Sequence, residues 1–208
     1  MQPHGGQPVA EAGAPLGAAP VVIMVHGRNA GPANILDLVP RLDRPNLTYL
    51  APAAAGRTWY PLSFMAEIEK NEPGISSAIA MLEELVARVE AAGVPRSRIV
   101  MLGFSQGACL TSEFAVRNAS RFGGFIIFTG GLIGPPGTTW DQSRSFGGTP
   151  IFMGSGDPDA HVPVSRVDES AAIFTAMGAR VTKKIYPGRG HFVSDNEILM
   201  AQALIDEV

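Results

Sequence analysis

Short runs of apolar residues alternate along this chain with longer segments in which apolar residues recur at helical spacing. Val21–Val25 consists of apolar residues only, which is typical of a strand buried on both faces. Similar runs predict strands at Leu47–Leu50, Arg98–Leu102, Phe125–Phe128 and Pro150–Met153. Arg180–Tyr186 instead alternates apolar and polar residues, so we expect this strand nearer to the edge of a sheet.

The segments between these runs predict helices. Apolar residues recur at helical spacing from Ile75 to Val89, and Gly93 ends that helix. Shorter patterns predict helices at Ile35–Leu42, Gly107–Asn118, 164–174 and from the Ser194/Glu197 capping box onward. This alternation indicates an α/β fold with a mostly parallel central sheet and helices on both faces. We expect a single domain over residues 1–208, preceded by a Gly/Ala/Pro-rich segment at residues 1–20.

A candidate nucleophile lies directly after one predicted strand. Gly103–Gly107 reads G-x-S-x-G, with Ser105 at its centre, and a predicted helix follows at once. Strand, tight turn and helix are the context that a nucleophile elbow requires. Since the flanking glycines permit the turn and the helix N-terminus favours negative charge, we predict that Ser105 is a catalytic nucleophile.

A serine nucleophile needs a base and an acid, which follow it in the chain in enzymes with such an elbow. His191 lies in a loop between the last predicted strand and the last helix, so we predict that it is the base. Asp157 and Asp159 follow the strand at Pro150–Met153, and either could orient the imidazole. We favour Asp157, because it lies nearer to the strand end, and keep Asp159 as the alternative. His161 is interpreted as an ordinary surface or core residue.

Two further segments are candidates for binding the substrate. Acyl transfer needs two backbone N–H groups at the oxyanion, and we expect these from Gln106 and from Arg28, in the loop after the first buried strand. Thr58–Met65 is apolar and aromatic, and we predict that Trp59 and Met65 from this segment wall an acyl pocket. The alternative for this segment is a loop that fills the core.

The remaining reactive side chains point to no second chemistry. Cys109 is expected to be a small core residue. No cluster of His, Cys and carboxylates has the spacing of metal ligands, so we predict no metal.

Taken together, His26-Gly27-Arg28-Asn29, Arg57–Pro61, GFSQGA, GSGDPD with Val162-Pro163, and YPGRGH resemble the carboxylesterase, phospholipase and acyl-protein thioesterase family of small α/β-hydrolases. The resemblance covers nearly the whole chain. It implies an α/β-hydrolase fold with no large cap domain and a triad of Ser105, an aspartate of the 157–159 loop and His191. It also implies hydrolysis of esters or thioesters without a cofactor. Two positions depart from the family pattern. Asn29 replaces a glycine, and the acid loop is longer than D-P-x-V-P, so alignment from Val162-Pro163 selects Asp159 instead of Asp157.

Three functions remain open at this point. The first is a carboxylesterase, a serine esterase acting on small to medium acyl chains through an acyl-enzyme on Ser105. The second is an acyl thioesterase or lysophospholipase acting on longer chains. The third is a catalytically silent binding protein on the same fold.

Composition bounds the partners and the location. Apolar residues make up 46% of the 208 residues and the net charge is −3, which argues against a nucleic-acid binder. Residues 1–20 lack the basic and apolar regions of a signal peptide, and no apolar run is long enough to span a bilayer. We expect a cytoplasmic protein with a small-molecule ester as substrate and no stable membrane insertion. The sequence offers no support for a homo-oligomer and does not exclude one.

Overall fold

The computed structural model describes residues 2–208 and contains one seven-stranded sheet with the strand order β1-β3-β2-β4-β5-β6-β7. Only β1 is antiparallel to its neighbour, and the other adjacent strands are parallel. The strands are β1 (Val9–Gly13), β2 (Val21–Val25), β3 (Thr48–Pro52), β4 (Ile99–Phe104), β5 (Gly124–Phe128), β6 (Pro150–Asp157) and β7 (Arg180–Pro187). The predicted α/β fold class is therefore confirmed.

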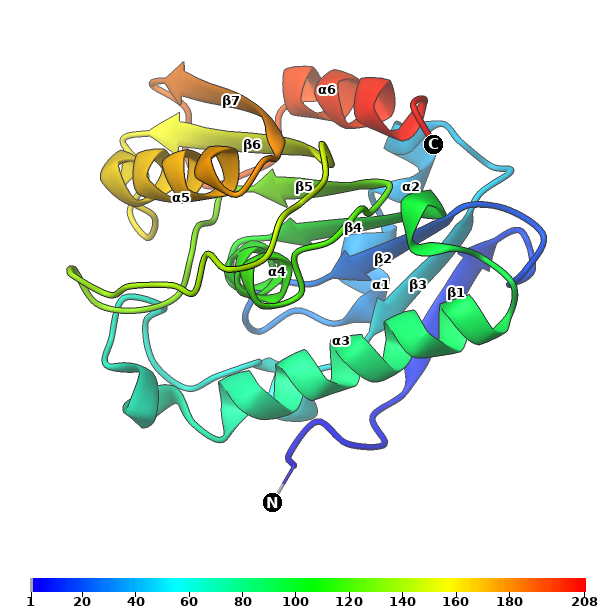
Figure 1. The fold of residues 1–208 in the computed structure, drawn as a ribbon, viewed down its shortest axis with the longest axis horizontal. Coiled ribbons are helices and arrows are strands. Elements are labelled where there is room, and N and C mark those ends of the chain that lie inside the picture. Colours follow the sequence, from blue (N-terminus) through cyan, green and yellow to red (C-terminus); the bar gives the residue numbers. More distant parts are fainter. Residues whose placement is uncertain (1) are drawn as a thin grey trace.

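Helices cover both faces of this sheet (Figure 1). They are α1 (Pro32–Leu36), α2 (Val39–Leu42), α3 (Gly74–Ala91), α4 (Gln106–Arg117), α5 (Val164–Ala176) and α6 (Asp195–Ile205), with short 3-10 helices at Ala55–Arg57, Ile68–Asn71 and Arg96–Arg98. None of the helices in residues 2–208 is both long enough and apolar enough to cross a bilayer.

Two apolar cores lie on opposite faces of the sheet because successive strand residues point to opposite sides. In β2, Ile23 belongs to the core that also contains residues of α3, α4 and α5, whereas Met24 belongs to the core that contains residues of α1, α2 and α6. Both residues are fully buried. This explains why the central strands are apolar at nearly every position, whereas β7, which lies at the sheet edge as expected, has no buried residue.

The structure differs from the sequence prediction in two elements. β1 lies within the Gly/Ala/Pro-rich segment, where no strand was expected, and pairs with β3 as an edge strand that is buried only in part. β6 continues beyond Met153 to Asp157, because its last residues pair with β7 up to Asp157 and Pro187. The second difference changes the candidate site.

Candidate active site

Ser105 lies in a sharp turn between β4 and α4. Its backbone has φ 56° and ψ −120°, a region that residues other than glycine rarely adopt. The flanking residues Gly103 and Gly107 must be glycines because neighbouring backbone atoms lie too close to them for a side chain. A Cβ atom at Gly103 would lie 2.4 Å from the carbonyl oxygen of Gly107, and one at Gly107 would lie 2.1 Å from that of Val25. The predicted strand–turn–helix context of Ser105 is confirmed.

Ser105, His191 and Asp159 form a chain of hydrogen bonds at the carboxyl ends of β4, β6 and β7. The hydroxyl oxygen of Ser105 lies 2.8 Å from Nε2 of His191, and Nδ1 of His191 lies 2.8 Å from Oδ2 of Asp159. With Nδ1–H donating to the carboxylate, Nε2 is free to accept the hydroxyl proton. The side chain of Asp159 is fully buried and that of His191 is 23% exposed.

The prediction that Asp157 contacts His191 is wrong, because the carboxylate at the imidazole is that of Asp159. Asp157 is the last residue of β6, and its backbone carbonyl accepts a hydrogen bond from the N–H of Gly188, so it still belongs to the sheet. The residue is exposed. The chain turns only after this position, and the turn carries the carboxylate of Asp159 back to the imidazole.

The acid loop is organised around Asp159. Oδ1 of its carboxylate accepts hydrogen bonds from the N–H groups of His161 and Val162, at 2.8 and 2.9 Å. Burial raises the pKa of Asp159, but these hydrogen bonds, together with the contact to His191, outweigh it and leave the pKa below its ordinary value. Asp159 is therefore held as a carboxylate beside His191.

His161 has a place that the sequence did not indicate. Its ring packs edge-on against that of His191, with the ring centroids 4.8 Å apart. It lines the same pocket as Ser105 and His191. Its position two residues after Asp159, in the loop that turns back toward His191, is the only signal that could have suggested it.

The loop after β2 lies beside Ser105 as predicted. Arg28 and Gln106 both line the pocket. Gln106 is the first residue of α4, where an N–H group has no intrahelical partner, and the N–H of Arg28 donates to no acceptor within residues 2–208. Asn29 has φ 59°, the left-handed conformation that asparagine tolerates, and its N–H donates to the carbonyl of Arg57 over 2.9 Å.

The pocket has a volume of about 520 Å³, and the predicted segment does wall it, but not through the predicted residues. Tyr60, Pro61, Leu62, Ser63 and Phe64 line it. Trp59 is wrong as a pocket residue. Its side chain is fully buried in the core, where the indole N–H donates to the carbonyl of His26 over 2.8 Å. The prediction that Met65 lines the pocket is wrong as well, because its side chain packs against the core and is not part of the pocket lining.

Gln106 connects the nucleophile turn to this wall. Its side-chain oxygen accepts a hydrogen bond from the N–H of Trp59 at 3.0 Å, and its side-chain nitrogen donates to the carbonyl of Tyr60 at 2.7 Å. Cys109, one turn further along α4, is a buried core residue at the pocket floor, as expected. Burial raises the pKa of its thiol to about 12, so it is not a thiolate at neutral pH.

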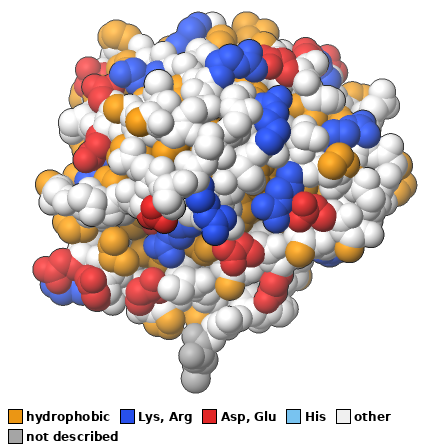
Figure 2. All heavy atoms as spheres, viewed as in Figure 1, with side chains coloured by type: hydrophobic (Ala, Val, Ile, Leu, Met, Phe, Trp, Pro, Cys, Tyr) orange, Lys and Arg blue, Asp and Glu red, His pale blue; other side chains and the backbone are white. Residues whose placement is uncertain are grey.

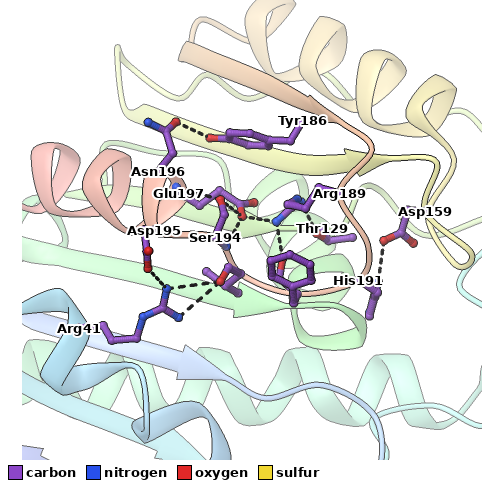
Figure 3. Close-up of polar contacts among 12 residues, drawn as sticks. Arg41, Thr129, Asp159, Tyr186, Arg189, His191, Ser194, Asp195, Asn196 and Glu197 are labelled. Carbon is purple, nitrogen blue, oxygen red and sulfur yellow. Dashed lines mark hydrogen bonds and ion pairs between the residues drawn. The ribbon is translucent and has the colours of Figure 1, made fainter.

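A buried ion pair supports the loop that carries His191 (Figure 3). The guanidinium of Arg189 pairs with Glu197 and donates to the carbonyl of Phe192 and, over 3.3 Å, to the hydroxyl of Thr129. The side chains of Arg189 and Glu197 are 7% and 0% exposed. Glu197 in turn accepts hydrogen bonds from the N–H and hydroxyl of Ser194, which confirms the predicted capping box. The pair thereby joins α6 and the ends of β5 and β7 around His191.

No group of three or more His, Cys, Asp and Glu side chains gathers as a metal site within the described residues. The arrangement is that of a nucleophile, a base and an acid beside two free backbone N–H groups, which is suited to acyl transfer.

Comparison with known proteins gives relatives with related activities. An acyl-protein thioesterase 1 of Eremothecium gossypii is 32% identical over 161 residues, or 74% of this chain and 66% of the relative. A probable carboxylesterase of Arabidopsis thaliana is 24% identical over 85% of this chain and 74% of its own length. The chain thus spans about two thirds to three quarters of these two curated relatives.

A solved structure covers the chain more completely. The phospholipase/carboxylesterase of Dyadobacter fermentans is 43% identical, covers 96% of both chains and superposes with a TM-score of 0.92. The model of the phospholipase/carboxylesterase family matches residues 14–208, which include every element that positions Ser105, Asp159 and His191. The chain therefore belongs to the phospholipase/carboxylesterase family of α/β-hydrolases.

Proposed function

We propose that this protein is a serine esterase that hydrolyses carboxylic esters of small to medium acyl chains through an acyl-enzyme on Ser105. The observation that carries the proposal is the unbroken chain of hydrogen bonds from Ser105 through His191 to Asp159. The same chain argues against a catalytically silent binding protein, since nothing but catalysis requires a base and an acid aligned behind a serine.

The chemistry follows from these contacts. His191 takes the proton of Ser105 as the hydroxyl oxygen attacks the ester carbonyl, and Asp159 stabilises the imidazolium that forms. The N–H groups of Arg28 and Gln106 bind the oxyanion. His191 then gives the proton to the leaving alcohol, and a water molecule that it deprotonates hydrolyses the acyl-enzyme by the reverse sequence.

The pocket supports the substrate size. Its volume of about 520 Å³ and its apolar wall of Leu62 and Phe64 suit an acyl chain of a few carbons up to medium length. The second candidate is a thioesterase acting on longer acyl chains, favoured by the identity of 32% to an acyl-protein thioesterase 1. Oxygen esters and thioesters in matched acyl series, from two to sixteen carbons, separate the two candidates by the chain length of highest kcat/KM.

A serine-directed fluorophosphonate tests the nucleophile directly. We expect it to label the wild-type protein and not Ser105→Ala, and we expect the same variant to lose nearly all ester hydrolysis while keeping its fold. Residual catalysis by the oxyanion hole alone can still exceed the reaction in water by about 10³–10⁴-fold. A Ser105→Ala variant that kept a tenth of the wild-type kcat would refute the assignment. The cytoplasmic location stays a prediction from the sequence.

A further inference from the structure

A second hollow adjoins the active-site pocket on the outer side of the loop after β2. Its volume is about 280 Å³, and it shares Gly27–Ala30 and Phe104 with the pocket. Arg57 and Asn34 belong to its lining and not to that of the pocket. The two hollows therefore border the same loop, which carries the predicted oxyanion N–H group.

The charge of this region has a single sign. The charged side chains that line the two hollows are Arg28 and Arg57, and no carboxylate lines either hollow. The whole protein has a net charge of −3, so a cationic site is contrary to the average charge of the molecule. Such a local excess attracts anions to the site while the rest of the surface does not.

Neither arginine has an acidic partner within residues 2–208, although most basic residues of this protein do. Ten of its 16 lysines and arginines form ion pairs. On the face shown in Figure 2, acidic and basic side chains are likewise interspersed. Within the described residues, no carboxylate therefore neutralises Arg28 or Arg57, and both line the second hollow.

Hydrogen bonds fix both arginines and leave donors free. The terminal nitrogens of Arg28 donate to the carbonyls of Pro61 and Leu62, at 2.7 and 2.5 Å. Nε of Arg57 lies 3.4 Å from the carbonyl of Ala30, so the terminal nitrogens of Arg57 stay available to a ligand. A guanidinium held in this way presents paired N–H groups, which match the oxygens of a carboxylate or phosphate.

We propose that the hollow lined by Arg28, Asn34 and Arg57 is a subsite for an anionic group of the substrate, so that the preferred esters carry a carboxylate or a phosphate on their acyl or alcohol part. This proposal rests on the proposed ester hydrolysis at Ser105, and it narrows the substrate class of that site from esters in general to anionic esters.

Kinetics on matched esters test the proposal. One series is an aryl ester of adipic acid with its distant carboxyl group free, methylated or replaced by a phosphonate, and a second series carries the same groups on the alcohol part. In at least one series, we expect kcat/KM to be about ten-fold higher for an anionic ester than for the neutral one, as a charge-assisted contact provides. This preference should shrink at high salt, because the site is open to solvent.

Arg57 is the residue to vary, since its side chain plays no part in the proposed chemistry. We expect Arg57→Gln to lower kcat/KM for the anionic ester about ten-fold, to leave the neutral ester unchanged, and Arg57→Lys to keep part of the preference. Arg121→Gln is the matched control. Arg121 is also exposed and also bonded to one carbonyl, that of Gly148, but it lies at the opposite end of the sheet and should change neither substrate.

The possible results separate this proposal from the proposed function. Hydrolysis of all esters at equal kcat/KM, with or without Arg57, would overturn the subsite alone. If Arg57→Gln lowered kcat/KM equally for all esters, Arg57 would be a support of the oxyanion loop, and the subsite would also be overturned. Hydrolysis of no ester would overturn the proposed function, and with it this inference. A preference for the carboxylate over the phosphonate, or the reverse, identifies which anion the subsite takes.

Discussion

Oδ2 of Asp159 lies 2.8 Å from Nδ1 of His191, although the two residues belong to separate loops that follow the neighbouring strands β6 and β7. The contact exists because β6 stays paired with β7 as far as Asp157. The chain therefore turns back only after Asp157, and not directly after the apolar run that ends at Met153. The length of a strand thus decides which of two adjacent aspartates faces the base.

The first prediction compares these aspartates. We expect Asp159→Asn to lower kcat for ester hydrolysis at least about 10³-fold, because an amide cannot balance the imidazolium or fix the tautomer of His191. Asp157→Asn removes the same charge from an exposed position two residues away and should lower kcat less than about three-fold. Both variants should be measured at one pH above neutrality. A larger loss in Asp157→Asn would contradict the geometry of the acid loop.

The second prediction concerns Gln106, whose side chain holds the pocket wall by its bonds to Trp59 and Tyr60. In Gln106→Ala the buried N–H of Trp59 loses its partner, whereas the carbonyl of Tyr60 keeps the hydroxyl of Thr58 at 3.0 Å. The unpaired N–H should lower the free energy of unfolding by about 1–3 kcal/mol. KM should rise because the wall is less well fixed. Urea unfolding and steady-state kinetics check both effects. Gln202→Ala, at a half-buried residue whose amide makes a solvent-exposed hydrogen bond to the carbonyl of Arg41, is the control and should stay within about 0.5 kcal/mol of wild type.

The third prediction concerns two buried histidines that flank Trp59. His4 bonds the carbonyl of Trp59 and the N–H of Ala55, and His26 accepts the N–H of Ala54. These bonds need neutral rings, and burial lowers the pKa of both below the ordinary value of 6.5.

The sign of the pH effect follows from proton uptake. Below pH 6.5 the unfolded chain takes up protons at these two positions while the folded protein does not, so stability falls as the pH falls. The slope should not exceed about 1.4 kcal/mol per pH unit for each histidine. We expect His4→Asn to reduce the slope of the free energy of unfolding between pH 6.5 and 5.5, and His161→Asn, at an exposed histidine, to keep it. An unchanged slope in His4→Asn would contradict this, because it would mean that His4 takes up as many protons in the folded protein as in the unfolded chain.

Hydrophobic periodicity predicted the sheet and its helices well because burial on two faces leaves a clear pattern, as in Val21–Val25. Ser105 and His191 were predictable because a tight glycine-flanked turn and a fixed chain order leave few candidates. These features depend on local backbone geometry, which the sequence encodes directly.

The errors arose where tertiary contacts decide the outcome. Trp59 is an aromatic residue in a loop, and contacts from distant segments, such as the carbonyl of His26 after β2, fix it in the core. β1 forms in a poorly patterned segment because the open edge of β3 provides a partner. Neither partner can be identified from the segment itself.

The last prediction concerns the buried pair of Arg189 and Glu197 beneath the loop of His191. Burial raises the pKa of Glu197 in spite of its bonds to Ser194 and the charge of Arg189, so the carboxylate depends on its partners to stay charged. The pair also lies tightly against β6, since a Cβ atom at Gly156 would lie 2.2 Å from the carbonyl oxygen of Arg189. A change in the pair therefore reaches both the acid loop and His191.

Arg189→Met leaves the carboxylate of Glu197 buried without a cation, and this should lower the free energy of unfolding by about 3–5 kcal/mol. We expect kcat to fall more than KM rises, because the base is displaced while the pocket wall is not. Adding Glu197→Leu to Arg189→Met removes the orphaned charge and should recover part of the stability but not kcat, since the loop keeps no anchor. Arg41→Gln is the control. It breaks the exposed pair between Arg41 and Asp195, which lies on α6 as Glu197 does, and it should lower the free energy of unfolding by no more than about 1 kcal/mol. Equal costs for Arg189→Met and Arg41→Gln in urea unfolding would show that the buried pair does not support the loop.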